Sequence, residues 1–99
     1  MARFTYIWEF FVAPAAQAQF EWEYGPGGAW VALFRKAPSY IETLLLHDHA
    51  DSLRYFTIDR WESQDSHDEL RSKCAREYDE IDRRCQGLTL RESLIGEFG

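Results

Sequence analysis

Apolar and polar residues alternate along the first segment of the chain in the pattern of a β-strand. Residues 4–12 divide between two faces, Phe4, Tyr6, Trp8 and Phe10 on one and Thr5, Ile7, Glu9 and Phe11 on the other. This period of two predicts a strand. Because both of its faces are largely apolar, we expect the strand to be central in a sheet or covered on both sides.

A short helix is predicted next. Pro14 suits its first turn, and Ala16, Phe20 and Tyr24 repeat at four-residue spacing until the glycine-rich segment 25–28 ends it. A further helical extension follows, with Trp30, Leu33 and Phe34 at i, i+3 and i+4 and Ala37–Pro38 as its end. Segment 25–28 lacks the Lys-Ser/Thr of a phosphate-binding loop, so a turn is the favoured interpretation.

Two strands, residues 40–47 and 53–61, are predicted to pair as a hairpin across the polar segment 48–52. The second of them alternates strictly. Its positions divide into Tyr55, Thr57, Asp59 and Trp61 on one face and Arg54, Phe56, Ile58 and Arg60 on the other.

A second helix is predicted over residues 64–85. Its apolar stripe is Leu70, Cys74, Tyr78, Ile81 and Cys85, at spacings of four, four, three and four. Ser63 or Ser66 can cap its start, and Gly87 is the predicted C-terminal cap. Beyond it, residues 89–92 are expected to form one helical turn and residues 94–98 a last short strand.

This order, βαββαβ, predicts one α+β domain over residues 1–99 with the ferredoxin-like fold: a four-stranded antiparallel sheet with both helices on one face. The opposite face of the sheet would then be open, although the first three strands place apolar residues on it. We therefore expect the same face of a second copy to cover it, which makes the protein a homodimer.

Composition supports a need for a partner or a pocket. The 99 residues are 45% hydrophobic and include seven Phe, five Tyr and four Trp, more bulky apolar material than a small two-layer monomer readily buries. The formal net charge is −6, and no Lys/Arg cluster longer than a pair occurs. Nucleic acid is therefore not an expected partner.

The hydropathy of the chain and the positions of its two cysteines predict the cellular compartment. No apolar run approaches the roughly 18 residues of a membrane span, and no separable signal-peptide core follows Met1, so a cytoplasmic protein without membrane contact is expected. Cys74 and Cys85 would lie about 16 Å apart along one helix at 1.5 Å per residue, too far for a disulfide. We interpret both as small buried apolar residues in a reducing environment.

The segment from Arg54 to Ser63, RYFTIDRWES, follows a predicted hairpin and leads into a capped helix. In this it resembles the antibiotic-biosynthesis-monooxygenase-like domains of the dimeric α/β-barrel superfamily, and the resemblance covers nearly the whole chain in element order. It implies a dimeric α/β barrel in which two sheets face each other across the dimer axis. It also implies a pocket between sheet and helices, where the best-studied relatives oxidise phenols or anthrones with dioxygen and no metal or flavin.

Only part of the family's site has counterparts in this chain. Trp61 matches the aromatic residue at the end of the third strand that often lines the pocket. Heme-degrading members add an Asn on the first strand and a His about ten residues beyond the Trp, whereas this chain has no Asn and has Arg71 at that spacing. Quinol-oxidising relatives often carry His in the second helix; here that helix holds only His67, in its first turn, where we expect it to be solvated.

Two residues are candidates for acid–base chemistry. Asp59, on a strand face expected to be buried between Thr57 and Trp61, would have a raised pKa suited to removing a proton from a bound ligand. The alternative is an ion pair with an Arg of the second helix or of a partner subunit. The same two alternatives, base or ion pair, apply to Glu9 and Glu42. His47 is the second candidate, as a lone pocket acid or base.

His47 and His49 stand two residues apart, a spacing from which two metal ligands can converge. A third ligand is not evident, so no metal is predicted and polar hairpin-end residues are the alternative. The candidate substrate-binding residues are aromatic, with core or interface packing as the alternative for each: Trp61, Tyr55, Trp8, Trp30 and Phe34.

Two functions remain open from the sequence. The first is a cofactor-independent monooxygenase acting on a small aromatic or phenolic compound. The second is a non-catalytic dimeric barrel that binds a ligand or stabilises an assembly, its interior filled by Phe20, Phe34 and Trp30. No Ser-His-Asp or Cys-His arrangement can be assembled, so hydrolase chemistry is not supported.

Overall fold

The computed structural model describes residues 3–99. Its sheet has four antiparallel strands, β1 (Phe4–Val12), β2 (Tyr40–His47), β3 (Arg54–Trp61) and β4 (Thr89–Phe98), in the order β2-β3-β1-β4. This order is that of the ferredoxin-like fold, which confirms the predicted fold class. As expected, β1 is a central strand, and β2 and β3 form the predicted hairpin.

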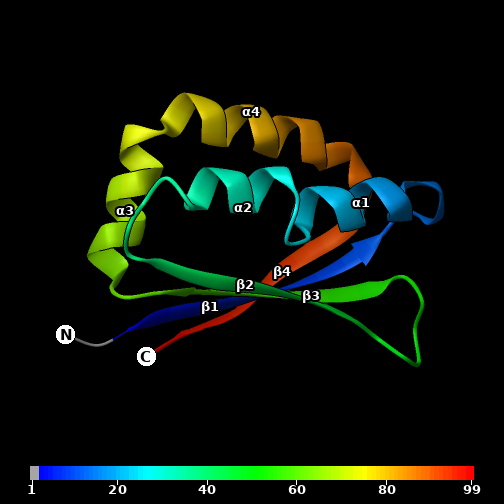
Figure 1. The fold of residues 1–99 in the computed structure, drawn as a ribbon. Coiled ribbons are helices and arrows are strands. Elements are labelled where there is room, and N and C mark those ends of the chain that lie inside the picture. Colours follow the sequence, from blue (N-terminus) through cyan, green and yellow to red (C-terminus); the bar gives the residue numbers. More distant parts are fainter. Residues whose placement is uncertain (1–2) are drawn as a thin grey trace.

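The helices all lie on one face of the sheet and leave the other face open (Figure 1). After β1 come a 3₁₀ turn (Pro14–Ala16), α1 (Gln17–Tyr24) and α2 (Ala29–Phe34); after β3 come α3 (Gln64–Lys73), α4 (Ala75–Cys85) and a second 3₁₀ turn (Gln86–Leu88). Within residues 3–99, no helix combines the length and apolar character that crossing a membrane would require.

The predicted helix 64–85 is two helices, because the backbone leaves the helical conformation at Cys74, with φ −108° and ψ 31°. The Cys74 N–H still donates to the Leu70 carbonyl and its carbonyl still accepts from Tyr78, so the chain turns without losing these hydrogen bonds. The turn directs α3 toward the sheet and α4 across the top of α2 (Figure 1). Neither Pro nor Gly lies at the kink, so the residue pattern did not indicate it.

Three smaller predictions were settled or corrected by the structure. Ser63 rather than Ser66 caps α3, because its hydroxyl accepts from the Ser66 N–H at 3.2 Å. Gly87 lies in the second 3₁₀ turn, and no residue from 3 to 99 has a positive φ, so it is not a left-handed cap. The predicted helical turn at residues 89–92 is wrong: β4 begins at Thr89 because the chain pairs with Val12 of β1 directly after the 3₁₀ turn.

Candidate functional site

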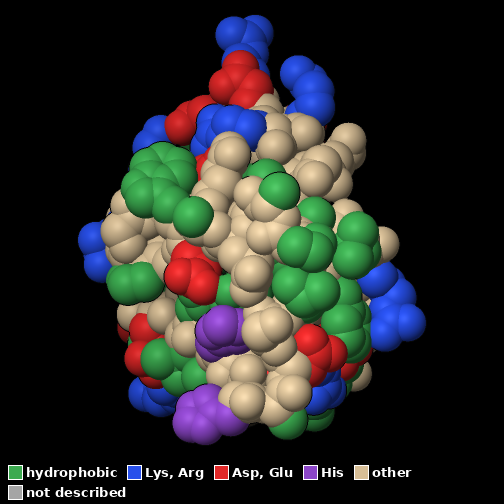
Figure 2. Space-filling view, turned by 90° about the vertical axis from the view of Figure 1, so that its right-hand side faces the viewer, with side chains coloured by type: hydrophobic (Ala, Val, Ile, Leu, Met, Phe, Trp, Pro, Cys, Tyr) green, Lys and Arg blue, Asp and Glu red, His purple; other side chains and the backbone are tan. Residues whose placement is uncertain are grey.

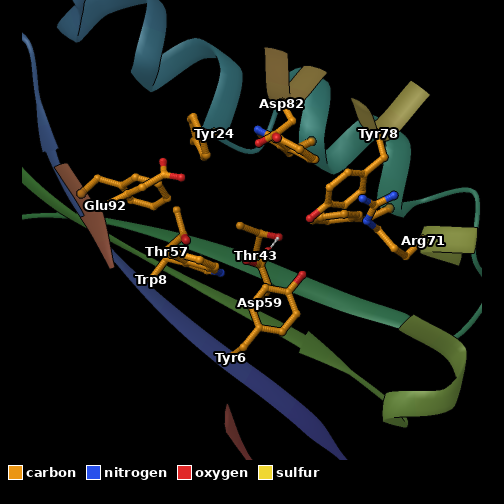
Figure 3. Close-up of a pocket in the computed structure, with 13 residues that line it drawn as sticks. Tyr6, Trp8, Tyr24, Thr43, Thr57, Asp59, Arg71, Tyr78, Asp82 and Glu92 are labelled. Atoms are coloured by element: carbon orange, nitrogen blue, oxygen red, sulfur yellow. Dashed lines mark hydrogen bonds between the residues drawn. The ribbon is translucent and has the colours of Figure 1, made fainter. Parts of the chain in front are cut away.

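A cavity of about 320 Å³ lies between the sheet and the helices. Figure 3 shows side chains entering it from the strands below and from the helices above. Most of its walls are aromatic, and its polar members come from β2, β3, β4, α3 and α4. The lining residues are Tyr6, Trp8, Phe10, Tyr24, Trp30, Phe34, Thr43, Thr57, Asp59, Arg71, Tyr78, Asp82 and Glu92.

Asp59 forms the floor of the cavity together with Thr57 and Thr43 (Figure 3). The strict alternation of β3 turns Asp59 toward the helices, and only 6% of it is exposed. The Thr43 hydroxyl donates to Oδ1 of Asp59 at 2.5 Å. Since that hydroxyl has one proton, the Tyr40 hydroxyl, 2.6 Å from Thr43 Oγ1, must donate to it.

Burial raises the pKa of Asp59 to about 6, and the hydrogen bond from Thr43 opposes part of that rise. No Arg, Lys or His within residues 3–99 forms an ion pair with this carboxylate, so the alternative of a salt bridge to the second helix is not realised in the chain. At neutral pH Asp59 is thus an ionised but weakly solvated base that faces an aromatic cavity.

The other two candidate bases, Glu9 and Glu42, form ion pairs on the open face of the sheet. Glu9 Oε2 accepts from Arg54 at 2.8 Å, and Glu42 Oε2 accepts from Arg60 at 2.6 Å. Their register places them directly opposite residues of β3 that point away from the helices. Asp59 is therefore the one of the three that meets the cavity.

Three of the predicted substrate-binding aromatics, Trp8, Trp30 and Phe34, line the cavity. Trp30 and Phe34 lie on α2 with ring centroids 5.9 Å apart, and the Tyr78 ring of α4 meets Trp30 edge-on at 4.9 Å. Burial raises the pKa of Tyr6 and of Tyr78, so these phenols stay protonated and can donate hydrogen bonds to a ligand.

The other two predicted aromatics, Trp61 and Tyr55, do not line the cavity. Both are completely buried. Trp61 packs against the rings of Phe34, Tyr40 and His67 at 5.2–5.3 Å. The Tyr55 hydroxyl donates to Glu21 of α1 at 2.5 Å. The two rings therefore belong to the packed core, Tyr55 at the start of β3 and Trp61 at its end.

His47 lies outside the cavity, at the hairpin end of the molecule, where histidine side chains show on the surface (Figure 2). Its ring stacks on Tyr55 at 4.2 Å, and its Nε2–H donates to the Ser52 carbonyl at 2.8 Å. His49 is exposed in the adjoining turn. Among the described residues, no group of three His, Cys, Asp or Glu side chains is placed to hold a metal ion.

The expectation that His67 is solvated is wrong. In the first turn of α3, its ring lies among Phe4, Tyr6 and Trp61, with centroids 5.2–5.4 Å away, and its side chain is only 17% exposed. Nδ1 lies 3.0 Å from Oδ1 of Asp68. His67 therefore packs against the filled end of β3 beside Tyr6 but is not among the residues that line the cavity.

Several lining residues were not singled out from the sequence. Phe10 and Thr57 share faces with predicted site residues, so the strand alternation was a usable signal for them. Tyr24 and Tyr78 were assigned to the core stripe of a helix. Arg71, Asp82 and Glu92 read as ordinary charged surface positions, and only the arrangement of α3, α4 and β4 brings them to the cavity.

Comparison with known proteins was informative at the level of structure. No family model matches the sequence, and no curated protein sequence matches it. Solved structures match over nearly the whole length of the chain. SnoaB, a cofactor-independent oxygenase from Streptomyces nogalater, has 19% sequence identity and a TM-score of 0.75, with 100% of this chain and 93% of that chain covered. The chain has the fold of the antibiotic biosynthesis monooxygenases.

Two further structures support this. A Bordetella bronchiseptica protein assigned to the antibiotic biosynthesis monooxygenases has 20% identity and a TM-score of 0.74, with 100% of this chain and 97% of that chain covered. A Nitrosomonas europaea protein with the same assignment has 10% identity and a TM-score of 0.74, covering 98% and 88%. At these identities the antibiotic biosynthesis monooxygenase fold is shared, while site residues must be argued from this chain itself.

Proposed function

We propose that this protein is a cofactor-independent monooxygenase that acts on a small aromatic or phenolic compound. The observation that carries the proposal is Asp59: a buried carboxylate with a raised pKa on the floor of an aromatic-walled cavity. The volume of about 320 Å³ lies near the lower end of the roughly 300–1,000 Å³ of small-molecule sites, which suits a ligand of two or three fused rings.

In the proposed reaction Asp59 removes a proton from the ring system, and Trp8, Trp30 and Phe34 hold the resulting anion. The anion transfers one electron to dioxygen, and the radical pair combines to form a carbon–oxygen bond as a peroxide. Loss of water across that peroxide leaves a carbonyl where the substrate had a CH₂ group. One oxygen atom of O₂ enters the product, the other leaves as water, and the substrate supplies all four electrons.

The raised pKa of Asp59 lowers the cost of the first step. Each pKa unit corresponds to about 1.4 kcal/mol. Proton transfer from a ring CH₂ that is as acidic as a phenol, with a pKa of about 10, to a base of pKa about 6 is therefore uphill by about 5 kcal/mol instead of about 8 for an ordinary Asp. Protonated Tyr6 and Tyr78 can stabilise the anion by donating hydrogen bonds.

Oxygen uptake with 1,8-dihydroxyanthrone as the test substrate addresses the proposal. We expect the protein to accelerate uptake over the spontaneous reaction, and Asp59→Asn to lower kcat about 100-fold or more, because the amide keeps the Thr43 hydrogen bond but is not a base. Asp65→Asn, an exposed change on α3, is the matched control. Equal rates for wild type and Asp59→Asn would contradict the assignment of the base.

The alternative, a non-catalytic ligand-binding barrel, predicts a different result in the same experiment. Such a protein would bind the anthrone, seen as quenching of tryptophan fluorescence, without accelerating oxygen uptake. The cavity favours either form of ligand binding over a purely structural dimer, because Phe20, Phe34 and Trp30 do not fill the space above Asp59.

We infer that two copies associate through the open face of the sheet. Apolar residues run across that face, with Ile7 and Ile58 paired at its centre and Leu44, Leu46 and Phe98 43–50% exposed. The ion pairs Glu9–Arg54 and Glu42–Arg60 neutralise charges on the same face. A second copy would bury this patch and supply the second sheet of a dimeric barrel.

Ile58→Asp tests the homodimer. We expect light scattering to report a dimer for the wild type and a monomer, or loss of folding, for the variant, since the carboxylates of both copies would meet in an apolar interface. Ala32→Asp, an exposed change on α2, should leave the dimer intact. A monomeric wild type would refute the inference.

A further inference from the structure

The cavity above Asp59 continues into a second hollow between α4 and β4. This hollow, about 410 Å³, is lined by residues of α1, α4, the second 3₁₀ turn and β4. Tyr24, Asp82 and Glu92 line both spaces, so they mark the junction between them. Figure 3 shows Asp82 descending from α4 and Glu92 rising from β4 at the end of the cavity where Tyr24 lies.

The two carboxylates at the junction have no neutralising partner. Within residues 3–99, neither Asp82 nor Glu92 takes part in an ion pair or a side-chain hydrogen bond. Burial raises the pKa of Glu92, and the negative charge of Asp82 adds to the rise. The two groups therefore repel each other across the junction, and a cation between them would relieve that repulsion.

Among the described residues, the cations that line the two spaces form no ion pair with Asp82 or Glu92. Arg91 lines the second hollow, but its guanidinium lies over the Phe11 ring at 4.4 Å. The lining of the cavity contains three carboxylates, Asp59, Asp82 and Glu92, and a single guanidinium, Arg71. Arg71 lies over the Tyr78 ring at 3.9 Å and reaches Asp79 at 3.3 Å. The junction therefore remains electronegative.

A separate observation identifies an unused hydrogen-bond donor in this region. Trp30 lines the same cavity and is only 8% exposed, yet its indole N–H makes no hydrogen bond of standard geometry to the described part of the chain. The Tyr24 hydroxyl and the Cys85 thiol lie near it without meeting that geometry. A buried donor without a partner is destabilising, and an oxygen atom of a bound ligand would supply the acceptor. The site would thus be complemented by a ligand that places a hydrogen-bond acceptor near Trp30 and a positive charge near Asp82 and Glu92.

We propose that the substrate is an aromatic ring system that carries a protonated amine, with the rings in the cavity above Asp59 and the ammonium group between Asp82 and Glu92. Tyr24 adds a cation–π surface at the same point. A carboxylate or phosphate at this position would be repelled. This inference rests on the proposed function for the use of the cavity, but it concerns binding and not turnover.

Matched probes test the proposal without a known substrate. 1-Naphthylmethylamine is protonated at pH 7, 1-naphthalenemethanol is its neutral counterpart and 1-naphthoate is anionic; titration calorimetry gives the Kd of each. We expect the amine to bind ~10-fold more tightly than the alcohol, or about 1.4 kcal/mol, and the naphthoate to bind most weakly. The preference should fall as salt is added, since the carboxylates are at the rim.

The variant Asp82→Asn/Glu92→Gln should lose the ~10-fold preference while the Kd of the alcohol stays the same. Glu80→Gln on α4 and Glu97→Gln on β4, exposed carboxylates outside both spaces, are the controls and should keep it. The inference is overturned if the alcohol binds as tightly as the amine, if the double variant weakens both alike, or if no probe binds at millimolar concentration. Oxygen uptake is measured separately, so a charge preference without turnover refutes only the proposed reaction.

Discussion

The two ends of β3 and its middle differ sharply, although all of these side chains face the same helices. At the ends, Tyr55 and Trp61 are completely buried and packed against other rings. In the middle, Thr57 and Asp59 are equally shielded from solvent but border a cavity. Burial alone therefore does not distinguish core from site in this sheet.

Two features produce the difference. The middle side chains are small, so they leave room that Tyr or Trp would occupy. In addition, separate elements cover each end: Phe20 of α1 lies 4.9 Å from the Tyr55 ring, while Phe34 of α2 and His67 of α3 meet Trp61. The cavity is the space that remains between these two packed ends, below α2 and α4.

The largest expected effect contrasts a tryptophan of the packed end with one of the cavity. Trp61→Ala should lower the free energy of unfolding by about 4 kcal/mol, because it removes a completely buried ring. Trp8→Ala should cost about 1 kcal/mol, because this ring is partly exposed and already borders a space, but it should weaken naphthalene-probe binding. Urea denaturation measures both, and equal losses would contradict the contrast.

A smaller effect is expected from Asp59→Asn. The carboxyl has a pKa of about 6 when folded against an ordinary value near 4, so the folded state binds more protons between these values and its stability falls as pH rises from about 4 to 6. Above pH 6 the cost reaches about 3 kcal/mol, and the variant should be more stable by that order. Below pH 4 the two proteins should converge.

Urea denaturation at pH 4 and pH 7 measures this difference. Asp65→Asn, an exposed carboxylate of α3, should follow the wild type at both values. If Asp59→Asn shows the same pH dependence as the wild type, Asp59 is not a desolvated carboxylate and the comparison between the middle and the ends of β3 loses its chemical basis.

The smallest effect separates two tyrosines of similar chemistry. Tyr40→Phe removes the hydrogen bond to Thr43, and Tyr55→Phe removes the one to Glu21 together with a long one, 3.3 Å, from Gln17. Each change should cost about 1 kcal/mol. Only Tyr40 is connected to the cavity, since it donates to Thr43, which donates to Asp59. Tyr40→Phe should therefore raise the pKa of Asp59 slightly in an NMR titration of its carboxyl carbon, and Tyr55→Phe should leave it unchanged.

Much of this architecture could be predicted before the structure. Alternation along residues 4–12 and 53–61 identified both central strands and the side of Asp59, because side-chain direction in a strand has a fixed period of two. The break at Cys74 and the strand at Thr89 could not be predicted. A kink without Pro or Gly leaves no local mark, and an edge strand with charged residues resembles a polar turn until its partner is known.

The sequence by itself therefore determined the order of elements, the two faces of the sheet and the inward direction of Asp59. The tertiary structure decided which inward residues meet empty space: Trp8 and Trp30 line the cavity, whereas Trp61 and Tyr55 fill its ends. It also brought Asp82 and Glu92 together from α4 and β4. The physical reason is that local periodicity sets the direction of a side chain, while the volume in front of it depends on elements distant in the chain.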